Sequence, residues 1–444
     1  MKVMKFGGTS VGSPERMKEV ARLVTRDAEP VFVVLSAMSG TTNQLVELTQ
    51  HLYNKRAEQA EELIDRLENT YLGHVANLYT TDEKRSQVGL LLKEKFDYLR
   101  SFSHDMFTSF EEKAIVAQGE VLSTNMVVAY LQEIGVDAIL LDALDFMRTD
   151  KDGEPNSEAI HDLLREVMEQ NGGHQVYITQ GFICRNAFGE VDNLLRGGSD
   201  YTASLVGAAL QAEEIQIWTD IDGLHNNDPR VVEHTEPVRE LNFGEAAELA
   251  YFGAKILHPT CVLPAKKADI PVRLKFTMDP DAPGTLITSR LTRGVMKAVA
   301  AKDNITVIKI RSSRMLLPTG FLRKVFEVFE SYHTLVDLVA TSEVGVSVSV
   351  SDDKYLTDIV QELEKYGRVY VDKNMCIVCV VGDFDWSNVG FATRAIDALR
   401  DIPVRMISFG GSNHNISMLI RADDKKRALQ CLSEKLFNVS SENQ

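Results

Sequence analysis

The sequence predicts an α/β protein: a mostly parallel sheet sandwiched by helices, followed by a tail of two βαββαβ units. Three observations support this fold class. Short apolar runs alternate with amphipathic helical patterns over the first two thirds of the chain, as in a parallel sheet wrapped by helices. After the turn region PDAPGTLIT the pattern changes, and one order of strands and helices then recurs. With 444 residues the chain is long enough for about three domains.

The catalytic part is expected to span residues 1–292. Its candidate strands are VMKF, PVFVVLSA, VDAILLDA, QVYITQGFI, EIQIWTD and IPVRLKF. Between the second and third of these lies a long charged segment, at about residues 43–133, whose amphipathic pattern predicts a helical insertion. Its charges are most simply those of a solvated helix face. The sequence leaves open whether this insertion closes over a substrate.

The tail is expected to hold two related units, at residues 300–372 and 373–444. The first contains ITVIKI, GFLRKVFEVFESYH, VDLVAT, GVSVSVS, YLTDIVQELEKYG and RVYVD, and the second contains MCIVCVV, NVGFATRAIDALRD, VRMISF, NISMLI and DKKRALQCLSEKLF. Two complete units would need about eight strands, and seven are visible. One unit therefore lacks a strand, or the two units share or interleave strands.

The composition favours small-molecule ligands over nucleic acid or membrane. The formal net charge is -16, from 64 acidic and 48 basic residues, whereas binding to nucleic acid or anionic lipid needs basic surface. No apolar run approaches the roughly 20 residues of a membrane span. Gly7 and Gly8 interrupt the region where a signal peptide would have its apolar core. We therefore expect a cytoplasmic protein.

The five cysteines are scattered and odd in number, which is not the pattern of a disulfide framework. Cys376 and Cys379 form a lone CxxC within an apolar strand, where residues three apart face opposite sides. No second pair exists to complete a zinc site. We interpret both residues as part of the core.

The segment KFGGTSVGSPER predicts a strand-to-helix turn that could hold phosphate. The strand ends at Phe6, and Ser13 followed by Pro14 is typical of a helix N-cap and first turn. Unpaired N–H groups and the positive end of a helix dipole attract phosphate oxygens at such a turn. A Walker A loop is excluded because Ser-Pro stands where Lys and then Ser or Thr are required. Lys5 could direct its ammonium toward a transferring phosphate, and a plain turn is the alternative.

The segment GEVDNLLRGGSDYTASLVGAAL repeats this logic at a second strand-to-helix junction. Gly197 and Gly198 allow close approach of the backbone, and Ser199 or Asp200 could cap the following helix. Capping does not explain Arg196, whose guanidinium suits bidentate capture of a carboxylate or phosphate. Two such helix starts on one sheet could hold a phosphoryl donor and its acceptor facing each other.

Three further segments carry candidate site residues. In IWTDIDGLHNNDPRVV a strand ends in Thr219 and Asp220, and the acids of the polar loop lack the order of a calcium loop, which favours turn chemistry and nucleotide contacts. YFGAKILHP offers Lys255 and His258, the latter being most simply a structural residue. Glu120, in AQGEVLST, could be a first-turn acid that suits a helix dipole.

Taken together, these segments resemble the aspartate kinases of the amino-acid kinase superfamily. The motifs KFGGTS, LSAMSGTTN, GEVLS, LLRGGSDYTA, WTDIDGLHNNDPRVV and FGAKILHP occur in the family's order. The tail, with VDLVATSEVGVSV, resembles paired ACT regulatory domains. The resemblance covers nearly all of the chain. RGGSDYTA and the segment from WTD to DPR are specific to it, whereas GGTS is shared with other amino-acid kinases.

The resemblance implies transfer of the γ-phosphoryl group of ATP, accompanied by Mg²⁺, to the β-carboxylate of L-aspartate. A carboxylate is already an anionic nucleophile, so the enzyme needs alignment and charge neutralisation rather than a general base. The family pattern makes Lys5 and Asp200 catalytic, with Asp200 orienting the lysine. The implied phosphate-binding positions are Gly7, Gly8, Thr9 and Ser10.

The resemblance also assigns positions to the two substrates. Those for the amino acid are Thr42, Glu120, Arg196, Ser199 and Asp200. Arg196 would clamp the α-carboxylate, and Glu120 and Asp200 would take the ammonium. Those for the nucleotide are Thr219, Asp220, His225, Arg230 and Lys255. His225 stands where related sequences often carry Tyr.

For regulation, the resemblance implies an amino acid bound between ACT units of two subunits, and therefore a homodimer or a larger assembly. The matching positions are Met315, Phe321, Leu322, Val336 and Asp337. Lysine is the expected effector, with Asp337 as the partner of its ammonium. Leu317, Pro318 and Leu335 depart from the lysine-sensitive pattern, and threonine is the rival effector.

The expected function is a catalytically competent, feedback-inhibited aspartate kinase that feeds the synthesis of lysine, threonine and methionine. One alternative is an amino-acid-sensing protein that keeps the fold without turnover, which the presence of Lys5 and Asp200 disfavours. A second is a kinase for another acidic amino acid, such as glutamate. No fused dehydrogenase module is expected.

Overall fold

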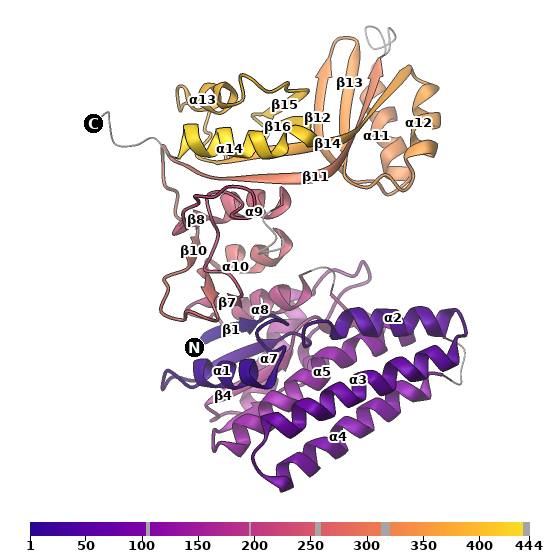
Figure 1. Ribbon diagram of the computed structural model, residues 1–444, viewed down its shortest axis with the longest axis vertical. Helices are drawn as coiled ribbons and strands as arrows, with labels where there is room; N and C mark the ends of the chain where they lie inside the picture. Colours follow the sequence, from indigo (N-terminus) through magenta and orange to yellow (C-terminus); the bar gives the residue numbers. More distant parts are fainter. Residues whose placement is uncertain (104–106, 195–196, 254–258, 312–319, 438–444) are drawn as a thin grey trace. The chain divides into compact units, whose positions relative to one another are not determined.

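The computed structural model describes residues 1–103, 107–194, 197–253, 259–311 and 320–437. The chain forms two compact units, whose helices and strands are labelled in Figure 1. Unit 1 comprises Met1–Leu224 and Ile256–Ser289, and unit 2 comprises His225–Lys255 and Arg290–Gln444.

Unit 1 is built on a mostly parallel sheet, as predicted. Its strands lie in the order β3-β4-β2-β1-β7-β9-β10, and of these neighbours only β9 and β10 pair antiparallel. The strands are β1 (Lys2–Phe6), β2 (Val31–Leu35), β3 (Ala138–Leu140), β4 (Val176–Gln180), β7 (Ile215–Thr219), β9 (Val272–Phe276) and β10 (Thr285–Thr288). Every residue of β2 and β4 is buried, as expected for strands covered on both faces.

Helices cover this sheet (Figure 1). Val31, Val33 and Leu35 of β2 lie in one core with the long helices, while the alternate residues Phe32 and Val34 are buried toward the opposite face. The helices outside the insertion are α1 (Pro14–Val24), α6 (Ala143–Phe146), α7 (Ser157–Gln170), α8 (Gly198–Ala209) and α10 (Leu263–Ala268), with a 3-10 turn at Pro259–Val262. A small hairpin joins β5 (Ile183–Arg185) and β6 (Val191–Asn193).

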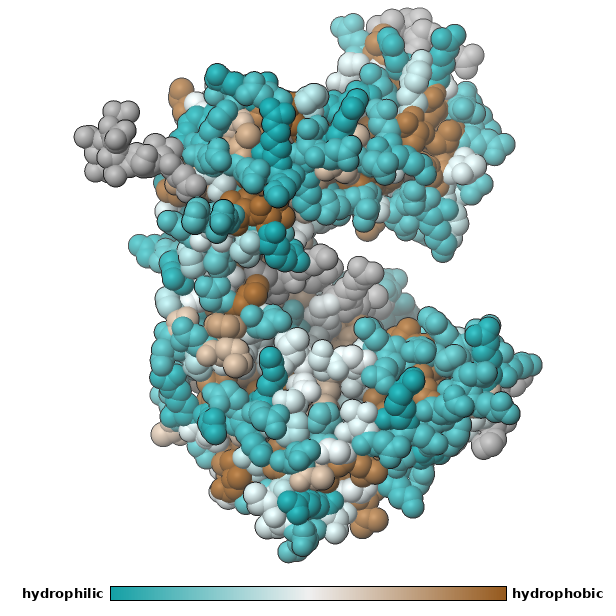
Figure 2. Space-filling view, in the orientation of Figure 1, coloured by the Kyte–Doolittle hydropathy of each residue, from teal (hydrophilic) through white to brown (hydrophobic). Residues whose placement is uncertain are grey.

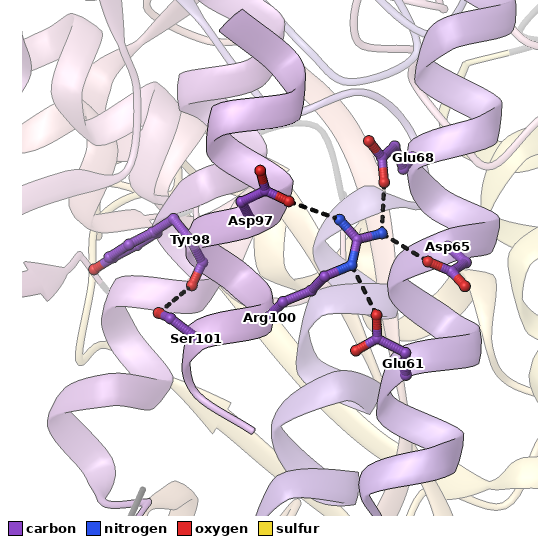
Figure 3. Close-up of polar contacts among 7 residues, drawn as sticks. All are labelled: Glu61, Asp65, Glu68, Asp97, Tyr98, Arg100 and Ser101. Atoms are coloured by element: carbon purple, nitrogen blue, oxygen red, sulfur yellow. Dashed lines mark hydrogen bonds and ion pairs between the residues drawn. The ribbon is translucent and has the colours of Figure 1, made fainter. Parts of the chain in front are cut away.

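The predicted insertion between β2 and β3 is helical. It contains α2 (Thr41–Tyr53), α3 (Ala57–Leu78), α4 (Asp82–Ser101) and α5 (Ser109–Glu133). Figure 3 shows how α3 and α4 are joined at Arg100, whose guanidinium binds the carboxylates Glu61, Asp65, Glu68 and Asp97. The face of the insertion that Figure 2 shows is largely hydrophilic, in agreement with the solvated charges predicted for it.

Helix α5 is long and apolar enough to cross a membrane by length and composition alone, a segment that the sequence analysis does not anticipate. However, 67% of its most apolar window is buried inside the protein. Ile115, Leu122 and Met126 of this helix are fully buried in the same core as β2. We therefore interpret α5 as a core helix.

Unit 2 contains an antiparallel sheet in the order β12-β13-β11-β14-β16-β15. The strands are β11 (Met296–Arg311), β12 (Val336–Ser342), β13 (Gly345–Val350), β14 (Arg368–Gly382), β15 (Met406–Phe409) and β16 (Asn415–Arg421). The long strands β11 and β14 pair with each other along almost their whole lengths, with irregularities between Met296 and Ala298 and between Lys302 and Val307. One half of β11 also pairs with β13, and the opposite half of β14 pairs with β16.

This pairing accounts for the missing eighth strand. The predicted strands RVYVD and MCIVCVV are one continuous strand, β14, and residues before ITVIKI, for which we predicted no strand, extend it into β11. One half of the β11–β14 ribbon completes a sheet with β12 and β13, and the other half completes a sheet with β15 and β16. The two repeats thus interleave strands. The predicted boundaries at 300–372 and 373–444 remain a prediction.

The helices of unit 2 cover two separate cores. They are α9 (Phe243–Tyr251), which follows β8 (Glu240–Asn242), and α11 (Phe321–Ser331), α12 (Leu356–Glu364), α13 (Phe391–Ala398) and α14 (Lys425–Leu436), with a 3-10 turn at Ala422–Asp424. Val325 and Phe329 of α11 belong to one core, and Leu429 of α14 belongs to the other. Cys376 and Cys379 are completely buried in β14, as expected for residues of the core.

Candidate active site

A polar cavity of about 350 Å³ lies in unit 1, where β1, β2 and β4 end. The carboxyl ends of parallel strands are where ligands bind in open α/β sheets. The lining residues come from the connections β1–α1, β2–α2 and β6–α8 with the adjacent ends of their elements, from the turn between β4 and β5, and from helix α5. They are Lys5, Gly8, Ser36, Ala37, Met38, Ser39, Gly40, Thr42, Asn43, Glu120, Phe182, Gly197, Gly198, Ser199 and Asp200.

Two charged residues that lie far apart in the sequence meet in this cavity. The Nζ atom of Lys5, on β1, is 2.7 Å from Oδ1 of Asp200, in the first turn of α8. Their side chains are 12% and 13% exposed, so the pair is shielded from bulk water but open to a ligand. A partly buried carboxylate beside the ammonium holds it in one orientation.

The glycine pair that follows β1 has two separate roles. A Cβ atom on Gly8 would lie 2.8 Å from the carbonyl oxygen of Ala37, so only glycine allows this loop to approach the next one. The carbonyl of Gly8 also accepts a hydrogen bond from the N–H of Ser39. A Cβ on Gly7, by contrast, would lie 3.6 Å from Nζ of Lys5. The Lys5 ammonium therefore lies next to the glycine loop.

The rest of this loop is held by the fold. The Ser10 side chain is buried, and its hydroxyl hydrogen-bonds to that of Thr277. Thr9 is exposed, and its carbonyl accepts a hydrogen bond from Arg16. Helix α1 begins at Pro14 with Ser13 as N-cap, as predicted.

Glu120 lies in the middle of α5, so our explanation of it as a first-turn acid is wrong. The residue is 4% exposed. Burial raises the pKa of its carboxyl group to about 7, although the N–H of Ala37 and the charge of Lys5 act in the opposite direction. Its Oε2 atom is buried and has no hydrogen-bond partner among the described residues. Such a group is a ready acceptor for a ligand cation.

Helix α8 starts differently from our prediction. Its N-cap is Gly197, in the left-handed conformation with φ of 75°, and no side chain caps the helix. Ser199 and Asp200 are therefore not capping residues, and both line the cavity instead. The uncapped N–H groups remain available for an anion.

Phe182 is a cavity residue that the sequence analysis misses. The predicted strand QVYITQGFI is interrupted here, because Phe182 has φ of 70°, an unusual value for a bulky residue. Its ring packs so closely on Gly198 that a Cβ there would lie 2.5 Å from Cδ2. The dipeptide Gly181-Phe182 after an apolar run is the signal that could have indicated a break.

Several predicted site residues lie outside the described residues: Arg196, Lys255, His258 and Met315. Of the other predicted nucleotide positions, Thr219 ends β7, and its carbonyl accepts hydrogen bonds from the N–H and hydroxyl of Thr277. Asp220 is exposed next to it. His225 and Arg230 belong to unit 2, where Arg230 forms two side-chain hydrogen bonds with Asp228.

The predicted effector positions lie on α11 and β12 of unit 2. Phe321 is buried, Leu322 is 41% exposed and Val336 is partly buried. The Asp337 side chain is only 1% exposed, and its Oδ1 atom binds Nζ of Lys302 at 2.6 Å and the hydroxyl of Tyr251 at 2.9 Å. Its Oδ2 atom is buried without a hydrogen-bond partner among the described residues. Asp337 thus already binds one ammonium group.

The sequence matches the amino acid kinase family over residues 1–275 and an ACT domain over residues 378–436. It is 37% identical over 456 residues to aspartokinase 1, chloroplastic, of Arabidopsis thaliana, covering 98% of this chain and 80% of the relative. It is 35% identical over 447 residues to the lysine-sensitive aspartokinase 3 of Escherichia coli, covering 98% of this chain and 99% of the relative.

The fold is similar to crystal structures of E. coli aspartokinase III. The structure with aspartate and ADP has a TM-score of 0.85 and 34% identity, and covers 98% of this chain and 100% of that one. The structure with lysine and aspartate has a TM-score of 0.79 and 34% identity, with 98% and 99% covered.

Proposed function

Because the chain belongs to the amino acid kinase family and is an ATP-dependent aspartokinase, we propose that the cavity in unit 1 holds L-aspartate, whose β-carboxylate accepts the γ-phosphoryl group. One observation carries this proposal. The ion pair of Lys5 and Asp200 shares a cavity with the buried carboxyl of Glu120 and the uncapped start of α8. A cation for the transferring phosphate and an anion for a substrate ammonium are therefore present together.

The chemistry needs little more than these groups. The acceptor oxygen is already ionised, and it attacks phosphorus while the bond from phosphorus to the bridging oxygen of ADP breaks. Two anions must approach each other, and the Lys5 ammonium lowers their repulsion where charge develops. Asp200 holds that ammonium in place at 2.7 Å. The amide N–H groups near Gly7 and Gly8 are assigned to the phosphate, together with Thr9 and Ser10.

Recognition of the amino acid is assigned to the remaining cavity residues. The Glu120 carboxylate would bind the substrate ammonium, with Asp200 contributing, and Thr42 and Ser199 would contact the acceptor. Arg196 is proposed to clamp the α-carboxylate. Opposite charges on the two sides of the substrate would select an amino acid over a plain diacid.

The nucleotide is proposed to bind at Thr219, Asp220, His225, Arg230 and Lys255. Within the described ranges no group of three or more His, Cys, Asp or Glu side chains could hold a metal ion. We therefore propose that Mg²⁺ arrives on the phosphates of ATP, as is usual for this ion, rather than in a protein cage. When bound, it would neutralise phosphate charge.

Trapping the acyl phosphate as a hydroxamate tests the proposal. With ATP, Mg²⁺ and L-aspartate the protein should give product, and Lys5→Met should lower kcat by at least about 100-fold. Lys2→Met is a matched control on the same strand, because Lys2 pairs with Asp27 at the surface and away from the cavity. The absence of product, or a larger kcat/KM for L-glutamate than for L-aspartate, would contradict the proposed acceptor.

We also propose feedback inhibition by lysine at β12. The support is Asp337, a buried carboxylate that already binds one ammonium and keeps a second oxygen unpartnered among the described residues. The E. coli relative is named lysine-sensitive, and one of its structures contains lysine. Met315, Phe321, Leu322 and Val336 would complete the site. Threonine is the rival effector.

Initial rates with lysine and threonine, separately and together, distinguish these effectors. Lysine should inhibit, and Asp337→Asn should abolish the inhibition while leaving kcat unchanged. Asp372→Asn is the control in the same sheet, because Asp372 forms an exposed ion pair with Arg405. Inhibition by threonine alone would refute the proposed effector.

Three further properties complete the proposal. Residues 1–292 would form the catalytic domain, and the two ACT units would associate with those of a second subunit in a homodimer. The molar mass from light scattering, measured with and without lysine, tests this assembly. We also propose a cytoplasmic location, since the five cysteines are free and thiols stay reduced in that compartment.

A further inference from the structure

The helical insertion reaches the cavity through one buried side chain. Tyr71, in the middle of α3, is 1% exposed, and its hydroxyl lies 2.9 Å from the hydroxyl of Thr41. The Tyr71 ring packs edge-on against Phe96 of α4, with ring centroids 5.8 Å apart. Burial raises the pKa of the Tyr71 phenol far above its usual range, so the hydroxyl stays neutral and can take part in this hydrogen bond.

Thr41 occupies a critical position next to the cavity. It is the first residue of α2, and it directly precedes Thr42, which lines the cavity. The N-cap of α2 is Gly40, with φ of 85°, so no side chain caps this helix start. The Thr41 hydroxyl therefore supplies a side-chain anchor at a point where the usual cap is absent.

The same loop is held from two other directions. The N–H of Ser39 donates to the carbonyl of Gly8, in the glycine loop. On the side of α5, the carbonyl of Ser36 accepts a hydrogen bond from the hydroxyl of Ser123. These three hydrogen bonds hold the cavity wall from Ser36 to Asn43. Of the three, only the one with Tyr71 comes from α3.

We propose that Tyr71 is a positioning residue for the phosphoryl acceptor, because its hydroxyl fixes the start of α2 and with it the wall of the cavity that carries Thr42. The inference rests on the proposed function, in which this cavity binds the amino acid. It assigns to the insertion a task in substrate recognition: without the phenol hydroxyl, the helix start relaxes and the amino acid binds less tightly.

A buried tyrosine elsewhere on the chain provides the comparison that separates positioning from stability. Tyr79 directly follows α3, is also 1% exposed, and donates a hydrogen bond to the carbonyl of Met126 at 2.7 Å. Tyr71→Phe and Tyr79→Phe therefore remove the same atom from equally buried sites. Neither Tyr79 nor Met126 lines the cavity.

The test measures KM for L-aspartate, KM for ATP, kcat and Tm on the full chain. Tyr71→Phe and Thr41→Val should each raise KM for L-aspartate roughly three- to tenfold, with KM for ATP changed by less than about twofold. The double variant should match the single ones, because both remove one interaction. Thr41→Ser keeps the hydroxyl and should restore KM. Tyr79→Phe should lower Tm and leave both KM values unchanged.

The outcomes separate the inference from its premise. If the wild-type chain gives no hydroxamate with L-aspartate, the proposed function and this inference both fail. If the wild type is active, but Tyr71→Phe and Thr41→Val leave KM for L-aspartate unchanged, the positioning role is refuted and the proposed function stands. Equal effects of Tyr71→Phe and Tyr79→Phe on KM and Tm would also refute it, since they would reflect stability.

Discussion

The raised pKa of Glu120 gives the sharpest prediction, since it couples substrate binding to stability. The carboxyl group is 4% exposed, and burial raises its pKa from the ordinary value of 4.5 to about 7. The folded protein therefore binds this proton more tightly than the unfolded chain does. Consequently, the free energy of unfolding falls as the pH rises from about 4.5 to about 7.

The size of this effect follows from the shift. At about 1.4 kcal/mol for each pH unit, the charged carboxylate costs the ligand-free protein about 3 kcal/mol above pH 7. About 2 kcal/mol of this cost develops between about pH 5 and pH 8. Glu120→Gln removes the charge and with it the pH dependence. Its stability relative to wild type should therefore improve as the pH rises.

Thermal unfolding of the ligand-free proteins between about pH 5 and pH 8 measures this difference. The Tm of Glu120→Gln relative to wild type should rise by roughly 4–8 °C over this range, given about 2–4 °C per kcal/mol for a unit of this size. Glu133→Gln, at the C-terminal end of α5, is the matched control. Hydrogen bonds from Thr80 and Thr81 lower the pKa of Glu133, so its contribution to stability has the opposite sign and is lost as the pH falls.

Aspartate binding should report on the same group. In the proposed function Glu120 binds the substrate ammonium, which requires its ionised form. KM for L-aspartate in the wild type should therefore rise as the pH falls below about 7, and binding should release protons. Glu120→Gln should raise KM at least about tenfold and remove this pH dependence. A Tm difference that is constant with pH, together with a KM profile parallel to that of the wild type, would refute the reasoning.

Three further substitutions test other parts of the structure. Asp200→Asn should lower kcat more than it changes KM for ATP, because Lys5 loses the partner that orients it; an unchanged kcat in steady-state assays would exclude that role. Gly119→Ala should cost about 1–3 kcal/mol in urea unfolding, because its Cβ would lie 2.8 Å from Cβ of Ala37, whereas Gly73→Ala, with open space around it, should not destabilise. Lys302→Met should lower the lysine concentration for half-inhibition, because in the proposed site the effector ammonium would compete with Lys302 for Asp337; a higher concentration would show that the two ammonium groups do not compete.

Much of the site was predictable from local sequence. The glycine pairs, the Ser13-Pro14 helix start and the alternation of apolar runs depend on neighbours in the chain, because turn conformations and helix or strand periodicity are local properties. The mostly parallel sheet, the helical insertion and Lys5 as a candidate phosphate ligand followed from these patterns, whereas the catalytic role of Asp200 came from the family resemblance. The distance between those two residues did not, since it depends on how β1 and α8 pack.

The tertiary structure decided what local patterns leave undetermined. Glu120 lies in mid-helix, so its pKa and its proposed role depend on the loop that covers it rather than on its position in α5. Tyr71 reads as an ordinary apolar position of an amphipathic helix until Thr41 is placed against its hydroxyl. Likewise, the continuity of β11 and β14 depends on their mutual hydrogen bonds. Periodicity indicates which face of an element is buried, but long-range packing alone selects the residue that it meets, and burial beside that partner sets its charge and its role.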